Sequence, residues 1–200
     1  MSRPRKSEHT REALLELGMA MIAEHGYHGT GLKGILDTAR VPKGSFYNYF
    51  KSKEEFVAEV IARYCLGMKA SVDACLEAAG DDPVEGLRCV YGLSFKASEA
   101  HGFRGCLVGN LAAEIGDADG PCRDAMQRGT GMFREQVVAL IEEAQQRHLF
   151  REDLSARALA DIFWSTWQGA LLGMKIGGDA EHLSRVMDAL LDRLFRPAKA

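Results

Sequence analysis

Residues 30–53 read TGLKGILDTARVPKGSFYNYFKSK, and this stretch decides the fold. A proline restricts the residue before it to extended conformations, so Pro42 favours a break after a short helix that begins near Thr30 and ends near Ala39. A threonine is a common N-cap, and we expect Thr30 to cap this helix. A second short helix is predicted from Lys43 to about Phe50. Two short helices joined by a tight turn form a helix-turn-helix, whose second helix enters the DNA major groove.

The second helix combines polar tips with apolar anchors. Phe46 and Phe50 are spaced to face a core, whereas Tyr47, Asn48 and Tyr49 carry hydrogen-bonding groups. An aromatic cluster alone more often packs a core, but a core does not require three polar tips. The backbone N–H groups at the helix start suit phosphate binding, and a glycine there permits close approach to DNA. The predicted DNA-binding residues are Lys33, Pro42, Lys43, Gly44, Ser45, Tyr47, Asn48, Tyr49 and Lys53.

The charge distribution fits this interpretation. Residues 1–53 contain nine Lys or Arg and five Asp or Glu, which gives +4, whereas the whole chain carries −3 and the remaining 147 residues therefore −7. Such an asymmetry suggests one end that faces a polyanion and one solvated body, although segregation by chance is the plainer explanation.

The rest of the chain is predicted to be helical as well. Apolar residues recur at helical spacing, and no stretch alternates with the period of a strand. We expect an all-α protein with a DNA-binding domain at 1–53 and an effector-sensing and dimerisation domain at 54–200, joined by a helix from about Ser52 to Ala79. No apolar stretch is long enough to span a membrane, and no secretory signal is present, so we expect a cytoplasmic protein.

The cysteines and histidines do not indicate a metal site or a cofactor. Five cysteines form an odd set without a CxxC pair, so neither a disulfide framework nor structural zinc is expected. An enzyme is the main rival class, with Cys106 and His101 as nucleophile and base. Cys106 lies five positions after His101 with two glycines between them, and no orienting third group is evident, so we expect no catalysis.

Residues 104–111 read RGCLVGNL and form the strongest feature of the second half. A thiol close to the start of a helix and to Arg104 favours the reactive thiolate. The plainer alternative for Cys106 is a small buried hydrophobe, the commoner fate of a lone cysteine. Lys175 ends an otherwise apolar stripe on a later helix and needs an acceptor, a thiolate or an escape to solvent. The alternative sensor is a noncovalent pocket for a small acid or hydrophobic effector, lined by Tyr91, Phe95, Phe133 and Trp164 with Lys175 as counter-ion.

Two C-terminal helices are predicted to form a homodimer interface. Gly169 and Gly173 give a small-residue face on the first, within about residues 155–176. The second, residues 180–195, offers Leu183, Val186, Met187, Leu190 and Leu194. The alternative is that these helices close the core of a single protomer.

Residues 41–54, VPKGSFYNYFKSKE, resemble the signature of the TetR family, and the likeness extends over about 8–56. The resemblance implies an all-α homodimeric repressor with a three-helix DNA-binding domain that leaves a palindromic operator when an effector binds. It also implies a DNA contact from Thr30. Gly34 and Arg40 depart from the family pattern, and Arg40 carries a modest strain if its φ is positive.

Residues 104–111 with Glu114, Trp164, Gly169 and Lys175 are similar to the electrophile-sensing and acrylate-responsive branch of that family. This similarity implies that an electrophile or oxidant acts at Cys106.

Overall fold

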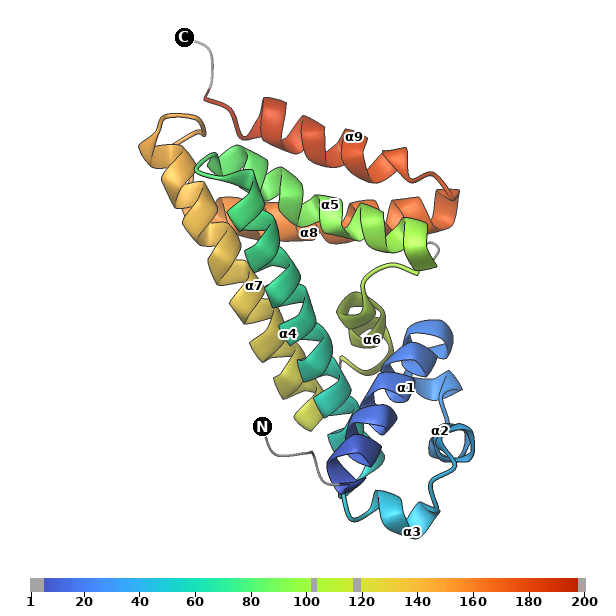
Figure 1. Ribbon diagram of the computed structural model, residues 1–200. Helices are drawn as coiled ribbons and strands as arrows, with labels where there is room; N and C mark the ends of the chain where they lie inside the picture. Colours follow the sequence, from blue (N-terminus) through green and yellow to red (C-terminus); the bar gives the residue numbers. More distant parts are fainter. Residues whose placement is uncertain (1–5, 102–103, 117–119, 198–200) are drawn as a thin grey trace. The chain divides into compact units, whose positions relative to one another are not determined.

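The computed structural model describes residues 6–101, 104–116 and 120–197, and within these ranges every regular element is a helix (Figure 1). The predicted all-helical class is confirmed. The helices are α1 (Lys6–Gly29), α2 (Leu32–Ala39), α3 (Lys43–Phe46), α4 (Lys53–Ala79), α5 (Pro83–His101), α6 (Leu107–Ile115), α7 (Pro121–Gln146), α8 (Ala156–Gly177) and α9 (Glu181–Ala189), which continues as the π-helical turn η1 (Leu190–Leu194).

The chain divides into two compact units. Unit 1 comprises residues 1–66 and 107–129, and unit 2 comprises residues 67–106 and 130–200. Helices α4 and α7 therefore each contribute to both units. The predicted division at residue 53 falls at the start of α4 and stays a prediction. Among the described helices, none is both long and apolar enough to cross a membrane.

Unit 1 is built around three phenylalanine rings. Phe46, Phe50 and Phe56 are almost fully buried, with centroids 4.9–5.7 Å apart. Gly18 of α1 allows the close approach of Phe56, because a Cβ at this position would lie 2.3 Å from Cζ of the ring. Helix α1 ends at Gly29 and has a kink at Gly26, where φ is 72°.

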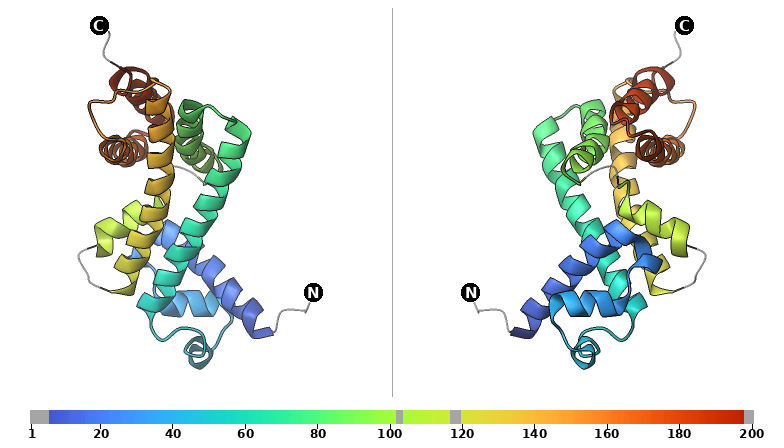
Figure 2. Two further views of the ribbon diagram at one scale, coloured as in Figure 1. Left: turned by 90° about the vertical axis from the view of Figure 1, so that its left-hand side faces the viewer. Right: turned by 90° about the vertical axis from the view of Figure 1, so that its right-hand side faces the viewer.

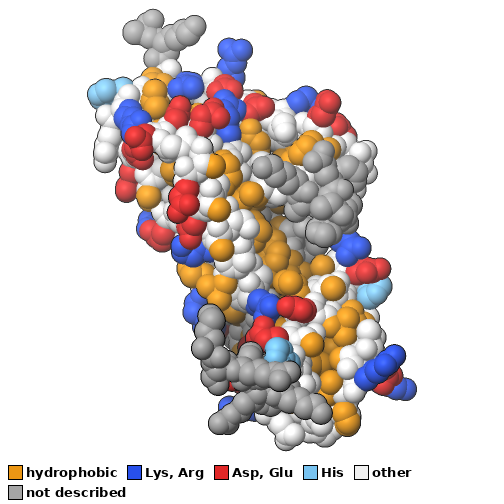
Figure 3. All heavy atoms as spheres, in the orientation of Figure 1, with side chains coloured by type: hydrophobic (Ala, Val, Ile, Leu, Met, Phe, Trp, Pro, Cys, Tyr) orange, Lys and Arg blue, Asp and Glu red, His pale blue; other side chains and the backbone are white. Residues whose placement is uncertain are grey.

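Unit 2 buries a large apolar cluster contributed by α4, α5, α7, α8 and α9. At its polar margin, Arg88 of α5 pairs with Asp188 of α9 and with Asp192 of η1, the latter at 2.6 Å. Tyr91 donates a 2.5 Å hydrogen bond to the same Asp188 carboxylate. Figure 3 shows basic and acidic side chains interspersed over this part of unit 2. These contacts fix α5 against α9.

The predicted dimer face is partly wrong. Leu183, Met187 and Leu190 of the last helices are buried inside unit 2, so they close the protomer's own core. Gly173 also serves this packing, because a Cβ there would lie 2.4 Å from Nε2 of His182. Gly169 instead has open space in front of it.

Candidate DNA-binding surface and effector site

The turn between α2 and α3 has the geometry of a helix-turn-helix. Arg40 adopts the left-handed conformation, with φ 54° and ψ 40°, and its N–H donates to the carbonyl of Asp37 at 3.2 Å. The N–H of Val41 donates to the carbonyl of Leu36 at 3.0 Å, which completes a Schellman motif without the usual glycine. Pro42 then starts α3 as its N-cap. The strain expected at Arg40 is therefore present.

Helix α3 is shorter than predicted, because α-helical geometry ends at Phe46 and residues 47–49 form turns. The turns continue the helical direction of the chain, since the N–H of Tyr49 donates to the carbonyl of Phe46 at 2.9 Å. In both views of Figure 2, α3 lies at one end of unit 1. Residues 42–50 expose one side to solvent and bury the other.

The apolar residues predicted to face the core are buried, and most of the predicted polar residues are exposed. Phe46 and Phe50 are buried, whereas the side chain of Tyr47 is 51% exposed. Ser45 and Tyr49 are half-buried at the edge of the same surface. The exposed members of the predicted set are Lys33, Pro42, Lys43, Gly44, Tyr47 and Asn48. We refer to residues 42–49 as the recognition surface.

Thr30 lies inside the protein instead of at a helix cap. Its side chain is fully buried, and its hydroxyl donates to the backbone carbonyl of Met21 at 3.2 Å. The N-cap of α2 is Gly31, with no side-chain hydrogen bond, so the predicted cap is wrong. The hydroxyl of Thr30 has no exposed surface for a phosphate.

Lys53 is engaged within unit 1. Its ammonium donates to the carbonyl of Tyr27 at 2.8 Å and lies 4.0 Å from the centroid of the Tyr27 ring. Burial lowers the pKa of Lys53, while burial and the nearby Glu54 carboxylate raise the pKa of Tyr27 to about 12. This lysine therefore links the end of α1 to the start of α4.

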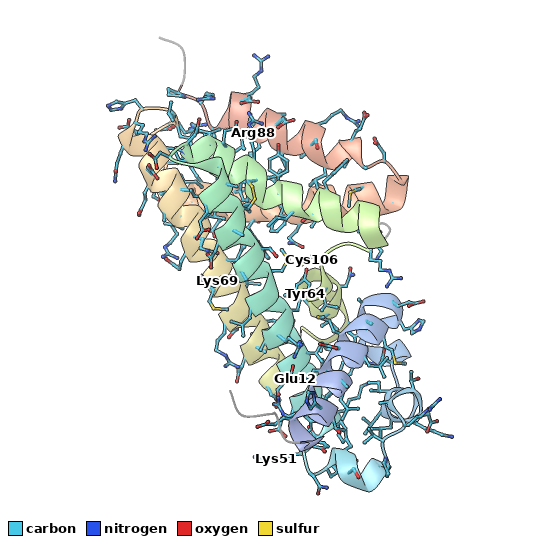
Figure 4. All side chains as sticks on the ribbon, viewed as in Figure 1. Glu12, Lys51, Tyr64, Lys69, Arg88 and Cys106 are labelled. Carbon is cyan, nitrogen blue, oxygen red and sulfur yellow. A yellow bond between two sulfur atoms is a disulfide. The ribbon has the colours of Figure 1, made fainter. Side chains whose placement is uncertain are left out.

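The four aromatic residues predicted for the effector site all belong to the apolar cluster of unit 2 or pack against it. Tyr91 and Phe133 belong to the buried cluster, and Phe95 and Trp164 pack against it. The ring of Phe133 lies 5.4 Å from that of Trp164. Cys106 also packs against this cluster and is half-buried (Figure 4). That these residues line an effector site stays a prediction.

Cys106 and Lys175 have different surroundings. Cys106 directly precedes α6, the short helix that the sequence predicted to begin there. Lys175 is exposed in the last turn of α8, where a positive charge is favourable, and it lies outside the apolar cluster. Of the options considered for Lys175, escape to solvent is the one observed.

Helix α6 is linked to α1 within unit 1. The N–H of His28 donates to Oε2 of Glu114 at 3.1 Å. A Cβ at Gly26 would lie 2.3 Å from Oε1 of the same carboxylate, so the glycine kink makes room for this contact. The C-terminal end of α6 is thus hydrogen-bonded to the last turn of α1.

Comparison with known proteins identifies the family. Residues 14–60 match "Bacterial regulatory proteins, tetR family", and residues 83–190 match "Tetracyclin repressor-like, C-terminal domain". The chain belongs to the TetR family. TetR repressors bind operator DNA and small-molecule effectors, typically as dimers, and this chain is a transcriptional repressor of that family and not an enzyme.

Three relatives place the repressor within the family. It is 32% identical to the HTH-type transcriptional repressor DhaR of Mycobacterium sp. (strain GP1), over 92% of each chain. It is 34% identical to the transcriptional regulator AcuR of Cereibacter sphaeroides, over 82% of this chain and 76% of AcuR. The crystal structure of Escherichia coli NemR in its reduced form superposes with a TM-score of 0.83 and 29% identity, over 92% of this chain and 96% of that one. The repressor therefore resembles the NemR-like branch.

Sequence reasoning missed one polar group, the indole N–H of Trp167, in the apolar cluster of unit 2. Trp167 is 3% exposed and stacks on Phe133 at 5.1 Å, yet its indole N–H has no hydrogen-bond partner among the described residues. A buried donor without an acceptor costs free energy, about 1–3 kcal/mol. The position of Trp167, three residues after Trp164 on the same helix, was the available signal.

Sequence reasoning also missed a disulfide. Cys75 of α4 and Cys89 of α5 are bonded, with their Cα atoms 5.9 Å apart (Figure 4). The expectation that the cysteines form no disulfide is wrong for this pair. Among the described residues, no group of His, Cys, Asp and Glu has the geometry to hold a metal ion.

Proposed function

We propose that this repressor is a homodimer that binds palindromic operator DNA through its two recognition surfaces, and that an electrophile or oxidant acting at Cys106 releases it. The observation that carries the proposal is the place of Cys106, half-buried against an aromatic cluster and immediately before α6. A half-buried thiol is reachable by a small reagent, and the cluster supplies an apolar surface for the reagent's carbon skeleton.

The chemical step is an addition. The Cys106 thiolate donates its electron pair to the terminal carbon of an activated alkene, a C–S bond forms, and the neighbouring carbon takes a proton from water. The added group changes the volume beside the first turn of α6. Glu114 of α6 accepts a hydrogen bond from the N–H of His28, so a displacement of α6 also moves the end of α1. The same end of α1 accepts a hydrogen bond from Lys53 at the carbonyl of Tyr27.

The test is release of the operator by N-ethylmaleimide. The assay follows fluorescence anisotropy of labelled DNA from upstream of the coding sequence. We expect Cys106→Ser to bind this DNA normally and to stay bound after treatment, while Cys122→Ser, the matched control in a buried thiol, is released like the wild type. Release of Cys106→Ser at the wild-type rate would contradict the proposal.

A second candidate is a noncovalent effector with a hydrogen-bond acceptor, such as a small carboxylic acid. The observation that favours it is the buried indole N–H of Trp167, which has no partner in the described part of the chain and lies within the aromatic cluster. Lys175, which is exposed and lies outside the cluster, is not part of this candidate. We expect acrylate to release the wild type but not Trp167→Phe, with Trp164→Phe as the control. Equal release of all three proteins would exclude this candidate.

The dimer is proposed to form through the outer face of α8. Ile162, Gly169, Leu172 and Ile176 recur there at helical spacing, and the side chains of Leu172 and Ile176 are 58% and 79% exposed. Exposed apolar residues gathered on one helix face indicate an interface. We expect Leu172→Asp to sediment as a monomer, whereas Leu66→Asp, an equally exposed leucine on α4, leaves the dimer intact. A dimeric Leu172→Asp would refute this face.

A further inference from the structure

The disulfide between Cys75 and Cys89 lies apart from Cys106 and joins two helices of unit 2. We infer that this pair is a reversible dithiol–disulfide switch, which controls how firmly α5 is held to α4. A DNA-binding protein works in a reducing compartment, where a disulfide persists only while an oxidant maintains it. The inference does not depend on Cys106 being the electrophile sensor.

The geometry accommodates both redox states. A Cα separation of 5.9 Å lies within the range of natural disulfides, so the bond forms without movement of either helix. The sulfur of Cys89 is also 3.4 Å from the backbone carbonyl oxygen of Cys75. When the pair is reduced, the Cys89 thiol therefore has an acceptor in place. Oxidation changes the tether between the helices and not their positions.

The two sulfurs differ in accessibility, which orders the chemical steps. Cys75 is buried and Cys89 is half-exposed. The Cys89 thiol loses its proton, the thiolate attacks hydrogen peroxide and the O–O bond breaks, which gives a sulfenic acid and a hydroxide that takes up the released proton as one water. The Cys75 thiol then attacks that sulfur and the hydroxyl leaves as a second water. Overall, two thiols and hydrogen peroxide give one disulfide and two waters, and a dithiol such as reduced glutaredoxin reverses the reaction by exchange.

The consequence concerns α5, because this helix contributes two of the aromatic residues predicted for the effector site. Tyr91 and Phe95 lie two and six residues beyond Cys89 on the same helix. The other end of the tether, α4, contributes to both units. A covalent bond between the helices opposes any opening of α5 away from α4, so the oxidised protein resists changes in the cluster more than the reduced protein does.

The test compares redox states of the full-length protein. Samples equilibrated in glutathione buffers, from fully reducing to strongly oxidising, are alkylated, and the thiols are read by peptide mass spectrometry. We expect Cys75 and Cys89 to interconvert together within this range. Amide hydrogen exchange in residues 84–90 should slow on the order of tenfold on oxidation of the wild type. It should not change in Cys89→Ser, and Cys75→Ala provides a second variant if the first folds poorly.

Three results would overturn the inference. The pair stays a disulfide in every buffer, it stays a dithiol in every buffer, or exchange in α5 is the same in both states. Cys122→Ser, which leaves the pair intact, should behave as the wild type. None of these readouts uses N-ethylmaleimide or operator release, so a failure of the sensor proposal at Cys106 is recognised separately.

Discussion

Replacing Phe46 and Tyr47 one at a time separates folding from DNA binding in adjacent residues of the recognition surface. Phe46 is fully buried and packs against Phe50 and Phe56, so Phe46→Ala should cost about 3–5 kcal/mol of unfolding free energy. The ring of Tyr47 is half-exposed and touches Phe46 edge-on, with centroids 5.4 Å apart. Losing that single ring contact should cost about 0.5–1.5 kcal/mol at most.

Operator affinity should show the opposite ranking once folding is taken into account. A side chain that contacts a base edge contributes about 1–3 kcal/mol, so Tyr47→Ala should weaken binding by roughly 5- to 150-fold. Tyr47→Phe removes only the hydroxyl and tests whether a hydrogen bond or the ring carries the effect. Stability is measured by urea unfolding followed by far-ultraviolet circular dichroism, and binding by fluorescence anisotropy at fixed salt, since salt alone changes the affinity.

Two outcomes would refute this division of roles. If Tyr47→Ala destabilises the protein as much as Phe46→Ala, the ring of Tyr47 belongs to the core and the exposed face has been misassigned. If Tyr47→Ala folds normally and binds operator within twofold of the wild type, the recognition surface does not use this side chain.

Three further predictions concern charge, packing and pH. Lys43→Ala should reduce the slope of log affinity against log salt by about 1, because one phosphate contact is lost. Gly129→Ala should lower the free energy of unfolding by about 1–3 kcal/mol, since its Cβ would lie 2.2 Å from the sulfur of Cys65. Gly131→Ala on the same helix meets open space and should raise the free energy of unfolding by about 0.5–1 kcal/mol. The midpoints of urea unfolding distinguish the two variants. Burial, followed by a hydrogen bond to a neighbouring carboxylate, raises the pKa of Tyr91 to about 12, so the folded state keeps a proton that the unfolded state loses near pH 10. Stability should therefore fall as pH rises from 10 to 12, and Tyr91→Phe should flatten that fall; an unchanged slope would contradict it.

The helix-turn-helix was predictable because its signals are local. Pro42 breaks the chain at a known place, and the spacing of Phe46 and Phe50 sets which side of α3 is buried. The left-handed conformation of Arg40 follows from the same turn, although a glycine is usual there. These residues interact with neighbours only a few positions away, so a pattern in the sequence contains most of the information.

The roles of Thr30 and Lys53 were not predictable in this way. Thr30 donates to a carbonyl nine residues earlier, and Lys53 donates to one 26 residues earlier. Both residue types suit a phosphate contact as well as an internal hydrogen bond, and local spacing does not distinguish the two. What decides is the kink at Gly26, which redirects the last turn of α1 and brings the carbonyl of Tyr27 to the ammonium of Lys53.

The disulfide is an intermediate case, because its signal was present but required the pairing of two helices. Cys75 and Cys89 each lie seven residues from Asp82, in the turn between α4 and α5. The short turn brings the start of α5 beside the end of α4, and the Cα atoms of the two cysteines lie 5.9 Å apart. A second contact joins the same two helices, since a Cβ at Gly86 would lie 3.1 Å from Cδ2 of Leu76. The short turn therefore holds the two sulfurs opposite each other whether or not they are bonded, which is the condition that a reversible switch requires.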